Sequence, residues 1–119
     1  MRVIVCGGRD YDDGTTVARV LSALDPAEAV VVVGVDPERP RGADGLVYSW
    51  CQIYYVTVEP HPADWKRHGR AAGPIRNQEM ADAGADLVIA FPGGAGTADM
   101  VGRARSAGVP VLHVDGGAA

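Results

Sequence analysis

Short apolar runs rich in β-branched residues alternate along the chain with longer segments of helical pattern, and this alternation limits the folds available to it. The apolar runs cover residues 2–6, 29–33, 54–58, 86–91 and 109–114, and the helical patterns lie near residues 13–24, 43–51, 74–83 and 97–107. Nearly continuous apolar strands that alternate with helices are typical of a parallel sheet covered on both faces. We therefore predict an α/β protein, a single Rossmann-like three-layer domain over residues 1–119.

Right-handed crossovers leave few arrangements for five parallel strands, and the commonest open one has the strand order 3-2-1-4-5. In this order the first and fourth strands are neighbours, and the loops that leave them meet at the carboxyl edge of the sheet, where ligands bind. Both loops are rich in glycine, since residues 7–10 are GGRD and residues 92–97 are PGGAGT. We predict that these two loops form one ligand site.

The PGGAGT loop follows an apolar strand and precedes a helix. Glycines in this position let backbone N–H groups approach a phosphate at the start of the helix, and a threonine can cap the helix or donate its hydroxyl. We predict that the phosphate is bound by Pro92, Gly93, Gly94, Gly96 and Thr97. A tight turn without a ligand is the alternative for this loop.

The GGRD loop is the second part of the predicted site. Gly7 and Gly8 make room for a ligand whose phosphate or ribose is contacted by Arg9 or Asp10. A structural ion pair between the arginine and the aspartate is the alternative, because such pairs are common where a loop leaves a strand.

A third candidate segment, residues 70–77, leads into a helix with a proline in its first turn. Free N–H groups at such a helix start suit an anion, and we predict ligand contacts from Gly73, Arg76 and Asn77, with a surface ion pair and an internal turn as alternatives. We predict that Trp65 covers the ligand base, with a buried or lid-packing role as the alternative. Asp44 is predicted to be a structural acid in the first turn of its helix.

Charge and cysteine content exclude several classes of partner. The formal net charge is −4, and a nucleic-acid partner is not expected because it requires a concentrated basic surface. The two cysteines, Cys6 and Cys51, form no cluster with the three isolated histidines, so we predict no metal site and no disulfide. The low cysteine content also fits a reducing cytoplasm, and no apolar stretch approaches the ~20 residues needed to cross a membrane, so we expect a cytoplasmic protein without a membrane partner.

Several spaced segments together resemble the YspA-like branch of the SLOG superfamily: residues 6–11, 41–44, 63–65, 69–77 and 90–97. The resemblance covers nearly the whole chain. It implies a Rossmann-like fold that binds nucleotides or nucleotide-derived ligands, in some relatives as a sensor. Residues 33–40 depart from the short His-Gly-Gly turn usual in this branch, and a change in this loop is expected to alter ligand selectivity.

The chain also resembles the LOG-type phosphoribohydrolases, which cleave nucleoside 5'-monophosphates with an arginine and the glutamate of a PGGxGTxxE motif. Arg76 is similar to that family's arginine, but Met100 stands in the place of the glutamate and Asp99 lies one position earlier. One residue turns a helical side chain by about 100°. Asp99 therefore does not take the direction of that glutamate, and the catalytic candidates are Arg76, which the resemblance implies, and Asp99, which stands one position before the glutamate's place.

We expect the chain to bind a nucleotide-derived small molecule without a cofactor. The alternatives are a nucleotide N-glycosidase, in which Asp99 or Asp10 replaces the glutamate, and a structural or interaction domain without a ligand. We also expect a homodimer, because small domains bury limited surface and related proteins often pair through helices beside the site.

Overall fold

A computed structural model of the chain describes residues 1–115, and it contains a five-stranded parallel sheet with the strand order β3-β2-β1-β4-β5. The strands are β1 (Arg2–Cys6), β2 (Val30–Val33), β3 (Thr57–Pro60), β4 (Leu87–Ala90) and β5 (Val111–His113). Every pairing between neighbours is parallel. The predicted Rossmann-like α/β fold and its strand order are confirmed.

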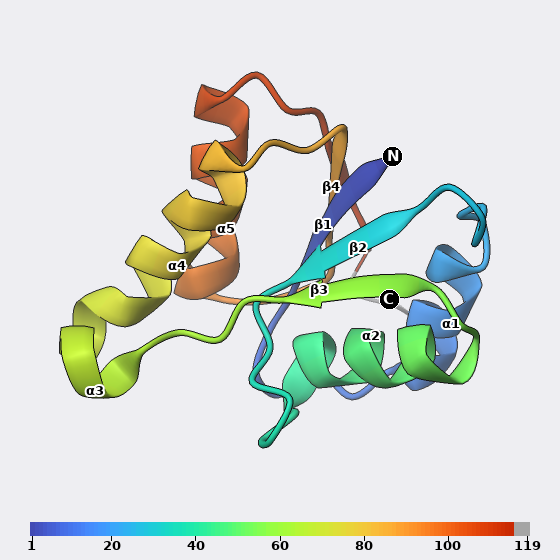
Figure 1. Cartoon of the computed structure of the whole chain (residues 1–119), viewed down its shortest axis with the longest axis horizontal. Helices are drawn as coiled ribbons and strands as arrows, with labels where there is room; N and C mark the ends of the chain where they lie inside the picture. Colours follow the sequence, from blue (N-terminus) through green and yellow to red (C-terminus); the bar gives the residue numbers. More distant parts are fainter. Residues whose placement is uncertain (116–119) are drawn as a thin grey trace.

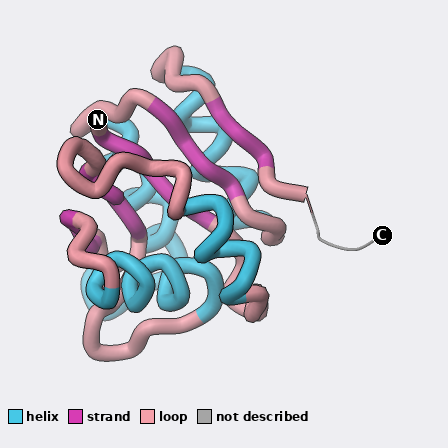
Figure 2. The backbone as a smooth tube through the Cα atoms, turned by 90° about the vertical axis from the view of Figure 1, so that its right-hand side faces the viewer, coloured by secondary structure: helices cyan, strands magenta, loops and turns pink. Residues whose placement is uncertain are grey.

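Helices cover both faces of the sheet, as Figures 1 and 2 show from two directions. The helices are α1 (Gly14–Leu21), α2 (Gly42–Ile53), α3 (Trp65–His68), α4 (Ala72–Asp82) and α5 (Ala95–Ser106), with a 3-10 turn at Gly69–Ala71 between α3 and α4. Helices α1 and α2 lie on one face of the sheet, and helices α4 and α5 lie on the other.

The core consists of two apolar layers, one on each side of the sheet. In β1, Val3 and Val5 pack with α1 and α2, whereas Ile4 and Cys6 pack with α4 and α5. Because successive side chains of a strand point to opposite faces, a strand covered on both sides must be apolar throughout. This requirement explains the continuous apolar runs in the sequence.

The main difference from the sequence prediction concerns β3, which was expected at residues 54–58 and occupies Thr57–Pro60. Helix α2 continues to Ile53, and the chain then turns at Tyr55, whose φ is 57°. The aromatic and β-branched residues at this position have high strand propensity, but they complete the helix and its turn instead. Helix α3 was not predicted.

Helix starts were predicted more accurately than this strand. Asp13 caps α1 by accepting a hydrogen bond from the Thr16 backbone N–H at 3.0 Å, and Pro74 lies in the first turn of α4 as expected. Helix α5 begins at Ala95, two residues before the predicted start, and Thr97 does not cap it. None of the helices in residues 1–115 is both long and apolar enough to cross a membrane.

Candidate functional site

A cavity of about 630 Å³ lies at the carboxyl edge of the sheet, beside the ends of β1 and β4. Its volume is in the range of small-molecule sites. All the predicted site residues line this cavity except Pro92 and Gly93. The cavity wall also includes residues that the sequence did not single out as ligand contacts, among them Gly34, Asp44 and Met80.

The two glycine loops contact each other beneath the cavity. The Gly8 backbone N–H donates to the Pro92 carbonyl oxygen at 2.9 Å, and a Cβ on Gly8 would lie 3.0 Å from that oxygen. A Cβ on Gly93 would collide with Thr97 and would lie 2.7 Å from the Gly8 nitrogen. Gly8 and Gly93 are therefore required for the close approach of the two loops.

Gly94 and Gly96 differ from Gly93, because a Cβ at either position would have no atom within 4 Å. Both residues line the cavity at the N-terminus of α5. Gly94 is the N-cap residue of this helix and no side chain caps it, so the N–H groups of the first turn lack partners within the helix. This arrangement presents partial positive charge to the cavity.

We predict that Gly93→Ala lowers the free energy of unfolding by about 1 to 3 kcal/mol, the usual effect of adding a methyl group to a tightly packed position. Gly96→Ala has no such clash and replaces a glycine inside a helix, so it should leave the protein as stable as the parent or slightly more stable. Urea unfolding of both variants measures the difference. Equal stability of the two would contradict the close contact of the loops.

Arg76 lies in α4, and two of its three guanidinium nitrogens donate hydrogen bonds within the protein. Its Nη1 donates to the carbonyl oxygens of Gly34 at 2.7 Å and His61 at 3.1 Å, and its Nε donates to Asn77 Oδ1 at 2.9 Å. Burial lowers the pKa of the guanidinium, and the nearby Asp44 opposes this effect. Nη2 donates no hydrogen bond within residues 1–115.

Asn77 connects this arginine to helix α5. The side chain is buried, and its Nδ2 donates to Asp99 Oδ2 at 3.0 Å and more weakly to the Gly96 carbonyl oxygen at 3.4 Å. Both ends of the amide are therefore used within the protein. Asn77 holds Arg76 and the start of α5 at fixed positions on the cavity wall.

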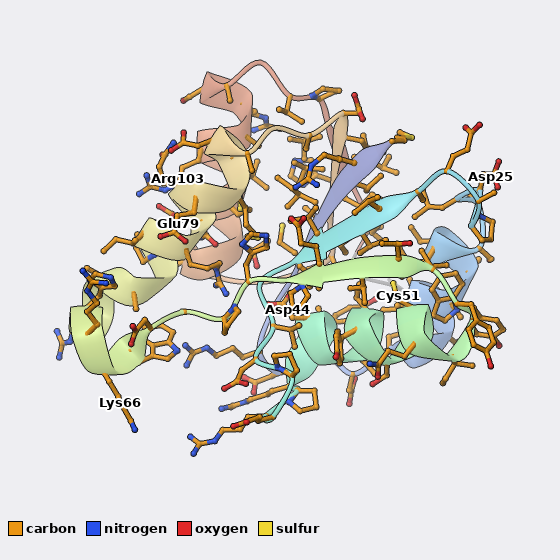
Figure 3. All side chains as sticks on the ribbon, in the orientation of Figure 1. Asp25, Asp44, Cys51, Lys66, Glu79 and Arg103 are labelled. Atoms are coloured by element: carbon orange, nitrogen blue, oxygen red, sulfur yellow. The ribbon has the colours of Figure 1, made fainter. Side chains whose placement is uncertain are left out.

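Asp99, the predicted catalytic acid, also lines the cavity, but its carboxylate is held by neighbours. Oδ2 accepts from Arg103 Nε at 2.9 Å as well as from Asn77, and the hydrogen bond from Arg103 lowers the pKa of the carboxyl. Figure 3 labels Arg103 on the outer side of the helix pair. An acid that is ionised at neutral pH can stabilise positive charge but is a poor proton donor.

Arg9, Asp10 and Trp65 form the exposed rim of the cavity. The Arg9 guanidinium carbon lies 5.5 Å from the centroid of the Trp65 ring, a cation–π distance, and half of the Trp65 residue surface is exposed. Asp10 forms its exposed ion pair with Arg41, at 3.6 Å, and not with Arg9. An aromatic ring and a guanidinium at the rim are suited to a planar base and an anion.

Asp44 is the residue whose surroundings the sequence did not reveal. It lies in the first turn of α2 as predicted, yet its carboxylate accepts no hydrogen bond within residues 1–115, and its Oδ1 is buried. Burial raises the pKa of this carboxyl to about 7, and the nearby Arg76 opposes the shift. Because α2 follows β2, its first turn lies at the carboxyl edge of the sheet, and the sequence order therefore places Asp44 at the edge where ligands bind. No sequence pattern indicates that its carboxylate lacks a hydrogen-bond donor.

The first residues of α2 explain why Asp44 reaches the cavity. Gly42 has a φ of 61°, and a Cβ there would lie 2.5 Å from the Gly8 carbonyl oxygen. The Ala43 backbone N–H donates to that same oxygen at 3.0 Å. These contacts hold the first turn of α2 against the GGRD loop, so the adjacent Asp44 lies beside the end of β1.

The parallel sheet, the glycine loops and the cavity at the carboxyl edge define a Rossmann-like α/β protein of the type that binds ligands at this edge. Residues 1–68 match the YAcAr family, described as the YspA, cpYpsA-related SLOG family. The chain belongs to this family, as its sequence motifs predict.

Similarity to a phage protein extends over nearly the whole length. The chain is 40% identical over 122 residues to the Gene 61 protein of Mycobacterium phage D29, and the alignment covers 94% of each chain. No solved structure matches the chain significantly.

Proposed function

We propose that this protein binds a nucleotide or a nucleotide-derived ligand in the cavity between the two glycine loops. The phosphate lies at the uncapped N-terminus of α5, beside Gly94 and Gly96. The observation that carries the proposal is the open space at these two glycines, because nothing in the described fold requires them to lack a side chain. Close approach of a phosphate to the backbone would explain why both positions are glycine, because a side chain would occupy the space of the phosphate.

The rest of the cavity supports a ligand larger than phosphate. The free Nη2 of Arg76 and the exposed guanidinium of Arg9 supply positive charge, and Trp65 at the rim supplies an aromatic face for the base. Family membership supports the same ligand class, because the SLOG resemblance implies nucleotide-related ligands.

Isothermal titration of the purified protein with AMP, ADP-ribose, NAD and cyclic AMP tests the proposal. Binding of at least one of these compounds is expected, together with a thermal shift in inorganic phosphate. If no compound binds and phosphate gives no shift, the proposed function is wrong. Chromatography of the AMP sample tests the N-glycosidase alternative, because release of adenine that is lost in Asp99→Asn would establish an enzyme.

Substitution of the two arginines separates their roles. Arg9→Ala should weaken AMP binding without lowering stability, because the Arg9 side chain is exposed and lies at cation–π distance from the Trp65 ring at the cavity rim. Arg76→Ala should weaken binding by about 1.5 to 3 kcal/mol and also destabilise the fold, since it leaves the carbonyls of Gly34 and His61 without their donor. Titration and urea unfolding measure both effects. Unchanged AMP affinity in Arg76→Ala would remove this arginine from the site.

A further inference from the structure

We propose that Asp44 binds the sugar of the ligand, with its carboxylate accepting a hydrogen bond from a sugar hydroxyl. This inference rests on the proposed function and specifies the ligand as a phosphorylated sugar or nucleotide with a free hydroxyl. The observations that lead to it are the position of Asp44 on the cavity wall and the absence of any hydrogen-bond donor to its carboxylate within residues 1–115.

A structural role does not explain this carboxylate. A buried carboxyl oxygen without a donor costs free energy, and structural acids in proteins are normally paired. Arg76 is close enough to affect the pKa of Asp44, but its Nη1 and Nε donate to Gly34, His61 and Asn77. The Cys6 thiol nearby stays protonated, because burial raises its pKa to about 12. A group that the ligand supplies therefore completes the site.

The surroundings of the two Asp44 oxygens indicate how a ligand can donate to them. Oδ1 is buried without a hydrogen-bond partner, and no side chain or backbone N–H of residues 1–115 donates to Oδ2. Asp44 lines the cavity, and because rotation about the terminal torsion of an aspartate exchanges its two oxygens, a ligand hydroxyl can donate to the oxygen that lacks a partner. Figure 3 labels Asp44 at the end of α2 that the loop after β2 enters.

The position of Asp44 relative to the proposed phosphate site indicates which group of the ligand donates to it. Helix α2 lies on one face of the sheet and α5 on the other, so the cavity joins an acidic wall to the positive start of α5. A carboxylate repels phosphate and accepts from hydroxyl or N–H groups. The sugar is bonded directly to the phosphate, and the aromatic surface for the base is at Trp65 on the rim. The hydroxyl of the sugar is therefore the donor assigned to Asp44.

Titration of the full-length chain with AMP, 2'-deoxy-AMP, 3'-deoxy-AMP and inorganic phosphate tests the inference. The parent protein should bind AMP about 10- to 100-fold more tightly than at least one deoxy analogue, the usual range for a hydrogen bond to a charged group. In Asp44→Ala this preference should disappear, while phosphate binds at least as well as to the parent. Asp44→Asn, which keeps the shape and one acceptor oxygen, should show a smaller loss.

Asp12→Ala is the matched control, because it removes one exposed carboxylate from a loop outside the cavity and changes the net charge equally. It should retain the preference of the parent. If Asp44→Ala keeps the preference for AMP, or if the parent has none, the inference is wrong although nucleotide binding stands. If Asp44→Ala lowers the affinity for AMP and for both deoxy analogues by the same factor, the donor belongs to the base and the sugar assignment is wrong. If AMP, ADP-ribose, NAD, cyclic AMP and phosphate all fail to bind the parent, the proposed function itself fails.

Discussion

Gly94→Val is expected to abolish detectable binding of AMP and inorganic phosphate while leaving the protein folded. A Cβ at Gly94 has no atom of the fold within 4 Å and enters the cavity at the start of α5. The branched side chain of valine would occupy the space assigned to the phosphate and block the N–H groups behind it. The free energy of unfolding should fall by no more than about 1 kcal/mol, because valine is a poorer N-cap than glycine.

Titration calorimetry and thermal unfolding measure the two effects in the same preparations. Gly102→Val is the matched control: it makes the same substitution in α5, at an exposed position outside the cavity with open space for a Cβ. This variant should bind AMP as the parent does. If Gly94→Val also bound AMP and phosphate normally, the start of α5 would not be the phosphate site.

Asp44→Asn is expected to stabilise the ligand-free protein at pH 8 and to change its stability little at pH 4. The pKa of this carboxyl is about 7 in the folded protein, compared with an ordinary value of 3.8. Between these values the folded state retains a proton that the unfolded state has lost, so stability falls as the pH rises from about 4 to about 7. This pKa difference lowers the free energy of unfolding of the parent by at most about 4 kcal/mol above pH 7.

Urea unfolding of the parent and of Asp44→Asn at several pH values between 4 and 8 measures this prediction. The difference in stability between the two proteins should grow through that interval and then remain constant. A variant less stable than the parent at pH 8 would show that Asp44 has a structural partner. A gain in stability together with weaker AMP binding is the behaviour expected of a site residue that is unfavourable to the fold without its ligand.

The sequence pattern alone predicted the architecture, because the architecture follows from the apolar character of each strand and from the general handedness of crossovers. A strand between two helical layers must be apolar on both faces, and β1 shows this at each residue from Val3 to Cys6. The handedness of crossovers then makes β1 and β4 neighbours, so the GGRD and PGGAGT loops meet. The end of α2 was predicted less well, because Tyr54 and Tyr55 have high strand propensity but close the helix, where the N–H groups of Tyr54 and Val56 donate to carbonyl oxygens of its last turn.

The sequence by itself therefore determined the fold class, the strand order, the family and the edge of the sheet where the loops gather. Tertiary structure decided what each residue at that edge does. It separates Gly93, which packs against Gly8, from Gly94, which opens onto the cavity, although the two are adjacent in one motif. It joins Asp99 to Asn77 and Arg103 and leaves Asp44 without a donor. The physical reason is that these differences depend on partners distant in the chain, which local patterns do not encode.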